Sequence, residues 1–242
     1  MILADLFHDI SDVFFPPLCI SCADVLPDCQ DKVFCRECLQ NIHYITQCHC
    51  PVCGAIFPDS PAGNHLCGSC LDNKPHYTFA RAALAYEGII LDAIHQFKYG
   101  RNIIHGAALA GLLADFHFPD MDWSTYDVII PVPLHIRRLR DRGFNQALLL
   151  ARALGKKHGL DVDFSLLKRR KLTLTQTGLD KKERAINIKG AFFAAQPGRL
   201  KEKNIILVDD VFTTGATINE CAKTLKKGGA NQVAAITLAR VL

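Results

Sequence analysis

Cysteine is concentrated in the first third of this sequence and strongly restricts its fold. Ten of the eleven cysteines lie between Cys19 and Cys70, and eight of these form four CxxC pairs. Each pair can turn two thiolates to one side of a tight turn, and two such turns complete a tetrahedral zinc site. The spacing is that of two consecutive zinc ribbons. We expect two structural Zn²⁺ ions, bound by Cys19, Cys22, Cys35, Cys38, Cys50, Cys53, Cys67 and Cys70.

A disulfide scaffold and a redox pair are the competing interpretations of these cysteines. The amino terminus carries Asp5 and Asp9 and lacks the basic start of a secretory signal, which disfavours an oxidising compartment. Four pairs in register favour structural metal over a single redox site. Because four thiolates fill the coordination sphere of zinc, neither site is expected to be catalytic. Cys29, Cys48 and His49 are candidates to replace one of these ligands, but we expect them to pack as ordinary side chains.

Charge is distributed unevenly along the chain. Hydrophobic residues make up 49% of the sequence and charged residues 21%, which indicates a globular protein. The longest apolar run, at residues 107–114, is too short to cross a bilayer, so we expect a soluble, cytoplasmic protein without membrane contacts. Residues 131–190 hold 15 Lys and Arg against 5 Asp and Glu, whereas the rest of the chain is acidic. A basic run is usually a solvated helix face, but this imbalance favours a phosphate-bearing ligand.

Strand-like and helix-like segments alternate from about Lys74 onward. Strands are predicted at residues 126–131, 204–208 and 232–238, and a strand running into a helix at residues 83–98. Helices are predicted at residues 103–116, 144–158 and 217–227. This alternation predicts an α/β fold with a mostly parallel sheet flanked by helices in residues 74–242, preceded by a small zinc-ribbon domain in residues 1–73. Ligands of such sheets bind beyond the carboxyl ends of the strands.

The stretch NIILVDDVFTTGATINE places polar chemistry at one of those strand ends. Asp209 and Asp210 follow an apolar strand, and a short turn then leads into a helix. Backbone amides and a helix amino terminus together bind anions, and a glycine allows close approach of the backbone. The two carboxylates could accept hydrogen bonds from the vicinal diol of a sugar phosphate. We expect a phosphate site formed by Thr213, Thr214, Gly215, Ala216 and Thr217.

Helix capping, nucleotide-binding loops and a receiver domain are the alternatives for this stretch. Capping would explain Thr217 but not two adjacent acidic residues at a strand end. The chain contains neither GxxxxGK[ST] nor GxGxxG, the motifs of nucleotide and dinucleotide sites. A receiver domain requires further strands after its acidic pair, and only 32 residues follow Asp210.

The segment IILVDDVFTTGAT resembles the phosphoribosyl pyrophosphate (PRPP) signature of type I phosphoribosyltransferases. With FKYG, PVPLHIRRLRDRGFNQALLLA, QTGLDKKERAINIKGAF and the CxxC pairs, essentially the whole chain resembles the ComF family, which includes competence protein ComFC and GntX. The resemblance implies a type I phosphoribosyltransferase-like domain behind a double zinc ribbon. It also implies PRPP with Mg²⁺ as the ligand, and a role in DNA uptake and natural transformation, in which internalised single-stranded DNA is handled.

The resemblance also implies roles for individual residues. Asp209 and Asp210 would contact the ribose hydroxyls of PRPP, and residues 213–217 would hold its 5-phosphate. The pyrophosphate loop, which commonly carries a non-proline cis peptide in this fold, would include Val132, Pro133 and Leu134, with Arg137, Arg138 and Arg142 as its cations. Further candidates are Lys98 and, in or beside a mobile loop over the site, Gln176, Arg184 and Asn187.

Two classes of function are compatible with these residues. The first is a Mg²⁺-dependent phosphoribosyltransferase with an unidentified acceptor, since no residues that would read an acceptor base are recognisable. The second is a non-catalytic PRPP-sensing or DNA- or protein-binding module. In that module the zinc ribbons and the basic segment would contact single-stranded DNA or proteins of the competence machinery.

Overall fold

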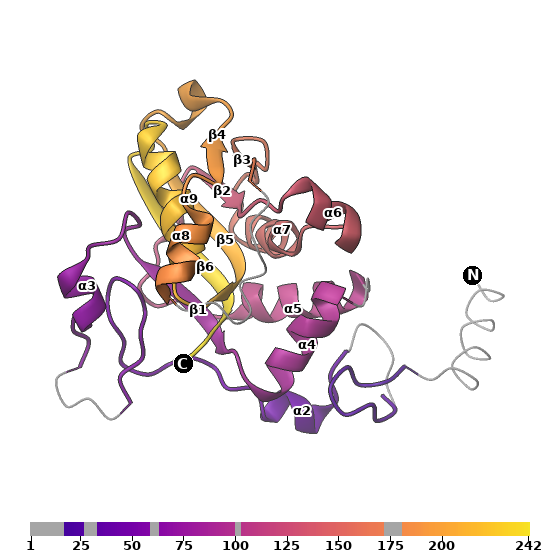
Figure 1. Cartoon of the computed structure of the whole chain (residues 1–242). Coiled ribbons are helices and arrows are strands. Elements are labelled where there is room, and N and C mark those ends of the chain that lie inside the picture. Colours follow the sequence, from indigo (N-terminus) through magenta and orange to yellow (C-terminus); the bar gives the residue numbers. More distant parts are fainter. Residues whose placement is uncertain (1–16, 27–32, 59–62, 100–102, 172–180) are drawn as a thin grey trace.

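The fold is built around a four-stranded parallel sheet (Figure 1). The computed structural model describes residues 17–26, 33–58, 63–99, 103–171 and 181–242. In this part of the chain the strands lie in the order β1 (Ala80–Ala85), β6 (Gln232–Arg240), β5 (Asn204–Phe212) and β2 (Val128–Pro131). All neighbouring strands are parallel, so their carboxyl ends meet at one edge of the sheet. That edge is where ligands of open α/β sheets bind.

Helices cover both faces of the sheet. Ile206 and Val208 of β5 pack on one face with α4 (Gly88–Tyr99), α5 (Ile103–Asp115) and α7 (Gln146–His158). Ile205 and Leu207 pack on the other face with α9 (Ala216–Lys227). Because both faces are buried, the strand reads as a continuous apolar run in the sequence. No helix in the described residues is both long and apolar enough to span a membrane.

The predicted strands and helices are confirmed with small changes at their ends, except that β5 is longer than predicted. It continues beyond Val208 to Phe212, so the acidic pair lies within the strand and not after it. The prediction of the strand end was wrong because the neighbouring strand β6 also extends further. In the register, Asp209 lies opposite Thr237 and Phe212 lies opposite Arg240. The acidic pair is therefore held on a rigid, hydrogen-bonded strand.

Several short elements were not predicted. They are α6 (Ile136–Arg142), α8 (Lys181–Ile188), the antiparallel strands β3 (Leu167–Arg169) and β4 (Phe192–Ala194), and the 3₁₀ turns η1 (Trp123–Thr125) and η2 (Pro197–Leu200). Two more short helices, α2 (Arg36–Gln40) and α3 (Gly68–Asp72), begin directly after cysteines. Helices this short are stabilised by their neighbours, so they leave little periodic signal in the sequence.

The cysteine-rich segment, within residues 17–73, contacts β1 and α4 (Figure 1). Residues 43–45 run antiparallel to β1 and exchange backbone hydrogen bonds with it. Further along, the amide of Ala80 donates to the carbonyl of Val52 at 2.8 Å. On α4, Gln96 donates to the carbonyl of Ile20 at 2.8 Å. Cys19 and Cys38, two of the predicted zinc ligands, thus share a hydrophobic core with α4 and α5.

Candidate functional site

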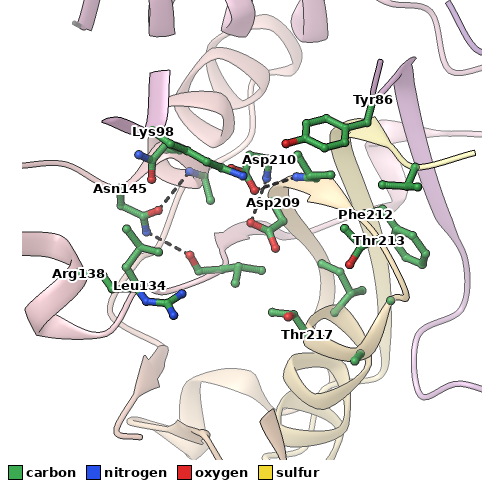
Figure 2. Close-up of a pocket in the computed structure, with 18 of the residues that line it drawn as sticks. Tyr86, Lys98, Leu134, Arg138, Asn145, Asp209, Asp210, Phe212, Thr213 and Thr217 are labelled. Atoms are coloured by element: carbon green, nitrogen blue, oxygen red, sulfur yellow. Dashed lines mark hydrogen bonds and ion pairs between the residues drawn. The ribbon is translucent and has the colours of Figure 1, made fainter. Parts of the chain in front are cut away.

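A cavity of about 530 Å³ opens at the carboxyl edge of the sheet (Figure 2). Its wall includes most of the predicted site residues: Lys98, Val132, Leu134, Arg138, Arg142, Asp209, Asp210, Thr213, Thr214, Gly215, Ala216 and Thr217. They come from α4, the loop after β2, α6, the end of β5 and the start of α9. A volume of this size suits a small-molecule ligand. The fold therefore gathers residues that are far apart in the sequence.

Other predicted site residues do not line this cavity. Pro133 lies in the loop between two lining residues, and Arg137 is exposed on α6. Arg138 and Arg142 are four positions apart and share a helix face, whereas Arg137 projects from a different face. Gln176 lies outside the described residues. Arg184 and Asn187 belong to α8, which is part of the segment predicted as a mobile loop.

The acidic pair on β5 is electrostatically unequal. The Nζ atom of Lys98 lies 2.7 Å from Oδ2 of Asp210, and both side chains are mostly buried. Burial disfavours the charge on Asp210, but the attraction of Lys98 outweighs it and lowers the pKa of that carboxyl. For Asp209, burial and the negative charge of Asp210 both act upward and raise its pKa. The site thus holds one firmly ionised carboxylate beside one whose charge is unfavourable without a further cation.

Residues 213–217, predicted as a phosphate site and called the phosphate-type loop below, connect the end of β5 to the first turn of α9. Gly215 is the residue that precedes the helix, with φ of 75°, and it offers no side chain to the amides of the first turn. A Cβ atom at this position would lie 2.6 Å from the ring of Phe212. The left-handed backbone and the close ring together require glycine here. Since Gly215 precedes α9 and Thr217 lies within its first turn, neither Thr217 nor the acidic pair is the capping residue.

Three arginine side chains form part of the cavity wall, called the arginine wall below. Arg138, Arg142 and Arg169 all line the cavity, and Figure 2 shows Arg138 opposite Thr213 and Thr217. Burial, and then repulsion by neighbouring guanidinium groups, lowers the pKa of Arg138 and of Arg169. Guanidinium groups bind phosphate oxygens in a bidentate manner. The cavity therefore combines the acidic pair with cationic side chains of a kind suited to phosphate groups.

Asn145 and Gln146 are among the cavity-lining residues that the sequence pattern did not predict. Asn145 accepts from the amide of Ala147 and donates to the carbonyl of Val132 at 3.1 Å, so it both caps α7 and holds the loop after β2. Gln146 is 2% exposed, and its Oε1 accepts from Arg142 while its Nε2 has no hydrogen-bond partner in the described part of the chain. This buried amide lies next to the arginine wall and fixes the position of Arg142. The Asn at a helix start was the one signal available in the sequence.

The peptide bonds of the loop after β2 are ordinary. Among the described residues there is no cis peptide bond, so the bonds of residues 131–134 are trans. The cis peptide that the resemblance implies for a pyrophosphate loop is not present here.

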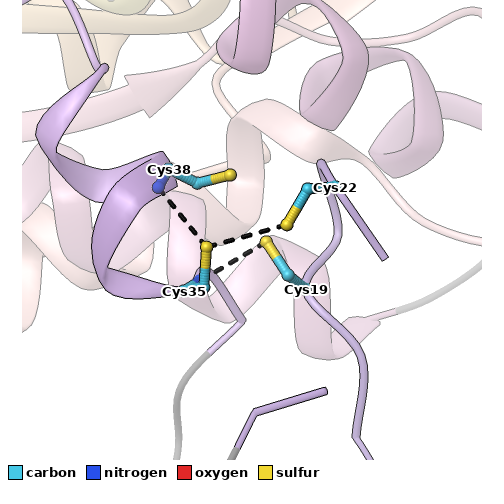
Figure 3. A group of neighbouring side chains, drawn as sticks. All are labelled: Cys19, Cys22, Cys35 and Cys38. Carbon is cyan, nitrogen blue, oxygen red and sulfur yellow. Dashed lines mark hydrogen bonds between the residues drawn. The ribbon is translucent and has the colours of Figure 1, made fainter. Parts of the chain in front are cut away.

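The cysteines that the spacing selected form two separate groups of four. In each group the ligand atoms all lie within 4.8 Å of one another, and Figure 3 shows the first group, Cys19, Cys22, Cys35 and Cys38. The second group is Cys50, Cys53, Cys67 and Cys70. The sulfurs of Cys22 and Cys35 are 3.7 Å apart. Tetrahedral zinc with Zn–S bonds of about 2.3 Å requires sulfurs about 3.8 Å apart, so this geometry fits zinc.

Backbone amides prepare both groups for metal. The amide of Cys35 donates to the sulfur of Cys19 at 3.3 Å, and that of Cys67 to the sulfur of Cys50 at 3.5 Å. Burial would raise the pKa of Cys19 and Cys50, but these amide hydrogen bonds lower it to about 6 in each case. Thiolates are the form that binds zinc. The two four-cysteine sites support structural zinc, and His49, which contacts Asp120, belongs to neither of them.

Two family models match this chain. A double zinc ribbon domain matches residues 10–71, and a phosphoribosyl transferase domain matches residues 139–242. The parallel sheet flanked by helices and the two cysteine groups agree with both models. The chain is thus a type I phosphoribosyltransferase-like α/β protein with an amino-terminal double zinc ribbon.

Full-length relatives narrow the class further. Competence protein F of Haemophilus influenzae is 31% identical over 223 residues, which cover 85% of this chain and 96% of that protein. DNA utilization protein YhgH of Salmonella typhimurium is 34% identical over 198 residues, 80% of this chain and 84% of that protein. Competence protein ComFC of Bacillus subtilis is 29% identical and covers 87% of this chain and 85% of that protein. The chain belongs to the ComF family.

Solved structures show a weaker likeness. The glutamine PRPP amidotransferase from B. subtilis, complexed with ADP and GMP, is 18% identical with a TM-score of 0.34. The match covers 58% of this chain and 26% of that structure, so this chain spans about a quarter of its length.

Proposed function

We propose that the cavity binds PRPP and that this binding serves a role in DNA uptake. The main observation behind the proposal is that one cavity is lined by three kinds of group. These are the backbone amides at a helix start, an acidic pair and the arginine wall. PRPP presents a 5-phosphate, a ribose diol and a pyrophosphate in the same order. The names of the relatives, competence protein and DNA utilization protein, support the cellular role.

The proposed contacts follow from this order. Residues 213–217 would receive the 5-phosphate, and Asp209 and Asp210 would accept hydrogen bonds from the ribose hydroxyls. Arg138 and Arg142 would bind the pyrophosphate together with the loop after β2, which Asn145 holds in place. Pro133 stays assigned to the pyrophosphate loop, whereas Arg137, predicted for that loop, is exposed outside the cavity and receives no contact with PRPP in this proposal. Gln176, Arg184 and Asn187 remain predictions for the mobile loop.

Mg²⁺ is the proposed cofactor because the donor set suits it. The acidic pair offers carboxylate oxygens. Lys98 pairs with Asp210, whereas burial and Asp210 disfavour the charge on Asp209, which a bound cation would stabilise. Mg²⁺ prefers oxygen ligands and keeps several waters. When bound with PRPP it would supply positive charge to the pyrophosphate. The protein's own residues would orient the ribose on β5 and stabilise the charge of the departing pyrophosphate with the arginine wall.

Titration calorimetry with PRPP, ribose 5-phosphate and pyrophosphate tests this assignment. We expect all three to bind in the presence of Mg²⁺ and PRPP to bind most tightly, because it alone would contact both the phosphate-type loop and the arginine wall. Pyrophosphate release in the presence of candidate acceptors would then distinguish a transferase from a sensor. If PRPP binds no better than pyrophosphate alone, the amide-rich loop does not hold its 5-phosphate and the assignment is wrong.

A non-catalytic role in binding single-stranded DNA is the second candidate function, and the surface next to the cavity favours it. Arg137 and Arg140 are exposed on α6, and Arg170 and Lys171 are exposed just after β3. None of the four lines the cavity. Such cations bind phosphate backbones without reading sequence. Proteins of the competence machinery could use the zinc ribbons in the same complex, in the cytoplasm, where the cysteine thiolates stay reduced.

We predict that Arg137→Gln/Arg140→Gln weakens binding of single-stranded DNA. Its log Kd should also depend less steeply on log salt concentration, by about 0.7 for each DNA phosphate that the variant no longer neutralises. Fluorescence anisotropy with labelled oligothymidylate at several salt concentrations measures both effects. PRPP binding should be unchanged, because neither side chain lines the cavity. An unchanged salt slope would exclude α6 from the DNA-binding surface.

A further inference from the structure

The second cysteine group lies close to the strand that leads into the phosphate-type loop. Arg240, the last residue of β6, is 7% exposed, and its Nη1 donates to the carbonyl of Cys53 at 2.8 Å. The same guanidinium lies over the ring of Phe212, with Cζ 5.1 Å from the ring centroid. Phe212 is the last residue of β5 and directly precedes the loop. One buried side chain therefore touches both a metal-site residue and the strand end beneath the loop.

Phe212 in turn supports the loop. Its ring fills the space next to Gly215, where a Cβ atom would lie only 2.6 Å away. Tyr77 packs edge-on against Phe212, with ring centroids 6.4 Å apart and an interplanar angle of 83°. Both Tyr77 and Phe212 are buried in the core that also contacts Cys53. A shift of the Phe212 ring would therefore move the start of α9.

The contact on the cysteine side is equally tight. A Cβ atom at Gly54 would lie 2.9 Å from Nη1 of Arg240 and 2.6 Å from the carbonyl oxygen of Ala80. The turn at Cys53 thus sits directly on the guanidinium. Zinc with four thiolates carries a net charge of about −2, and a buried cation beside it compensates that charge. Loss of the metal would remove this partner and release the turn that Arg240 holds.

We propose that Arg240 is a positioning residue that couples the metal-bound state of the second cysteine group to the geometry of the phosphate-type loop. The identity of the ligand rests on the proposed function, whereas the coupling itself is a property of the protein alone. Coupling between sites is reciprocal. A ligand in the loop should therefore raise the affinity of the second group for zinc.

Arg81 provides a matched control. It lies on β1, next to β6, and its Nη2 donates to the carbonyl of Pro51 at 3.1 Å in the same cysteine turn. It also donates to Asp120, and it lines a separate cavity of about 340 Å³. Both arginines thus attach the second ribbon to the sheet, but only Arg240 also packs on Phe212. A role confined to ribbon docking would give the two variants the same phenotype.

The test compares Arg240→Gln with Arg81→Gln in the full-length, zinc-loaded protein. Amide hydrogen exchange should increase at residues 212–217 in Arg240→Gln and stay at the wild-type level there in Arg81→Gln. Affinity for ribose 5-phosphate should fall about tenfold in Arg240→Gln, the scale of coupling through packed side chains, while affinity for pyrophosphate stays unchanged. In the wild type, ribose 5-phosphate should raise the affinity of one of the two zinc sites, measured by equilibrium competition with a chelator.

Each outcome separates the coupling from the ligand assignment. Wild-type exchange at residues 212–217 in Arg240→Gln, or an equal increase in both variants, would overturn the coupling. Increased exchange in Arg240→Gln with no binding of ribose 5-phosphate to the wild type would uphold the coupling and refute the PRPP assignment. If Arg240→Gln does not fold, Arg240→Lys keeps the charge but lacks the planar group that lies on the ring. That variant should show the same loop-specific increase in exchange, and wild-type exchange in it would also overturn the proposal.

Discussion

Replacing Asp209 with Asn is expected to stabilise the protein while weakening its binding of PRPP. In the ligand-free protein, burial and the charge of Asp210 raise the pKa of Asp209 above its usual range. The folded state therefore binds the proton more tightly than the unfolded state. The protonated Asp209 contributes all of this stability at pH values below the ordinary carboxyl pKa of about 3.9. The contribution is lost as the pH rises through the pKa of Asp209 in the folded protein.

The new side chain in Asp209→Asn cannot ionise, so the variant does not lose stability as the pH rises to neutral values. We expect the free energy of unfolding of Asp209→Asn to exceed that of the wild type by about 1–2 kcal/mol near pH 8, the usual scale for removing a destabilising functional residue. The difference should shrink as the pH approaches 5, where Asp209 of the wild type is protonated. Urea unfolding at several pH values measures this. A variant that is less stable than the wild type near pH 8 would contradict the electrostatic account of the pair.

The double variant Asp209→Asn/Asp210→Asn should bind PRPP at least about 100-fold more weakly, because two charge-assisted hydrogen bonds contribute about 1.5–3 kcal/mol each. Calorimetric titration with PRPP and Mg²⁺ measures this loss. Asp115→Asn is the control, since Asp115 is an exposed carboxylate at the end of α5 and does not line the cavity. Wild-type affinity in the double variant would remove β5 from the proposed site.

Removal of zinc is expected to cause the largest loss of stability. Cys19 and Cys38 of the first group are buried in the same core as α4 and α5, so their release disrupts packing beyond the ribbon. Structural zinc contributes on the order of 10 kcal/mol of binding free energy to the fold of such sites. Metal analysis should find two zinc ions per chain. Chelation should lower the melting temperature by more than about 10 °C, since about 1 kcal/mol corresponds to 2–4 °C in a chain of this size.

Single cysteine substitutions can show which of the two cysteine groups accounts for the destabilisation on zinc removal. Cys38→Ser should lose one of the two zinc ions and show the destabilisation of the first ribbon. Cys48→Ser is the matched control, because Cys48 lies in the same segment but belongs to neither group of four. Equal stability of Cys38→Ser and Cys48→Ser would mean that the first group does not depend on metal.

Local patterns in the sequence were sufficient for much of this architecture. The CxxC spacings predicted both cysteine groups, because two thiolates within one tight turn are already close before any tertiary contact forms. Apolar runs predicted β2, β5 and β6, because strands covered on both faces are apolar over most of their length. The position of the phosphate-type loop could also be predicted from local sequence, because its glycine and the start of the next helix are consecutive in the chain.

Tertiary structure alone decided how these parts are combined. The acidic pair lies within β5 because β6 extends to Arg240 and continues the hydrogen-bonded ladder, and no pattern inside β5 reports the length of its neighbour. Gln146 became a buried donor in the cavity wall only when α7 packed against the loop after β2. Arg240 links the second cysteine group to Phe212 across distant parts of the sequence. Local spacing determines chemistry that lies within one turn, whereas contacts between segments depend on which strands and helices pack together.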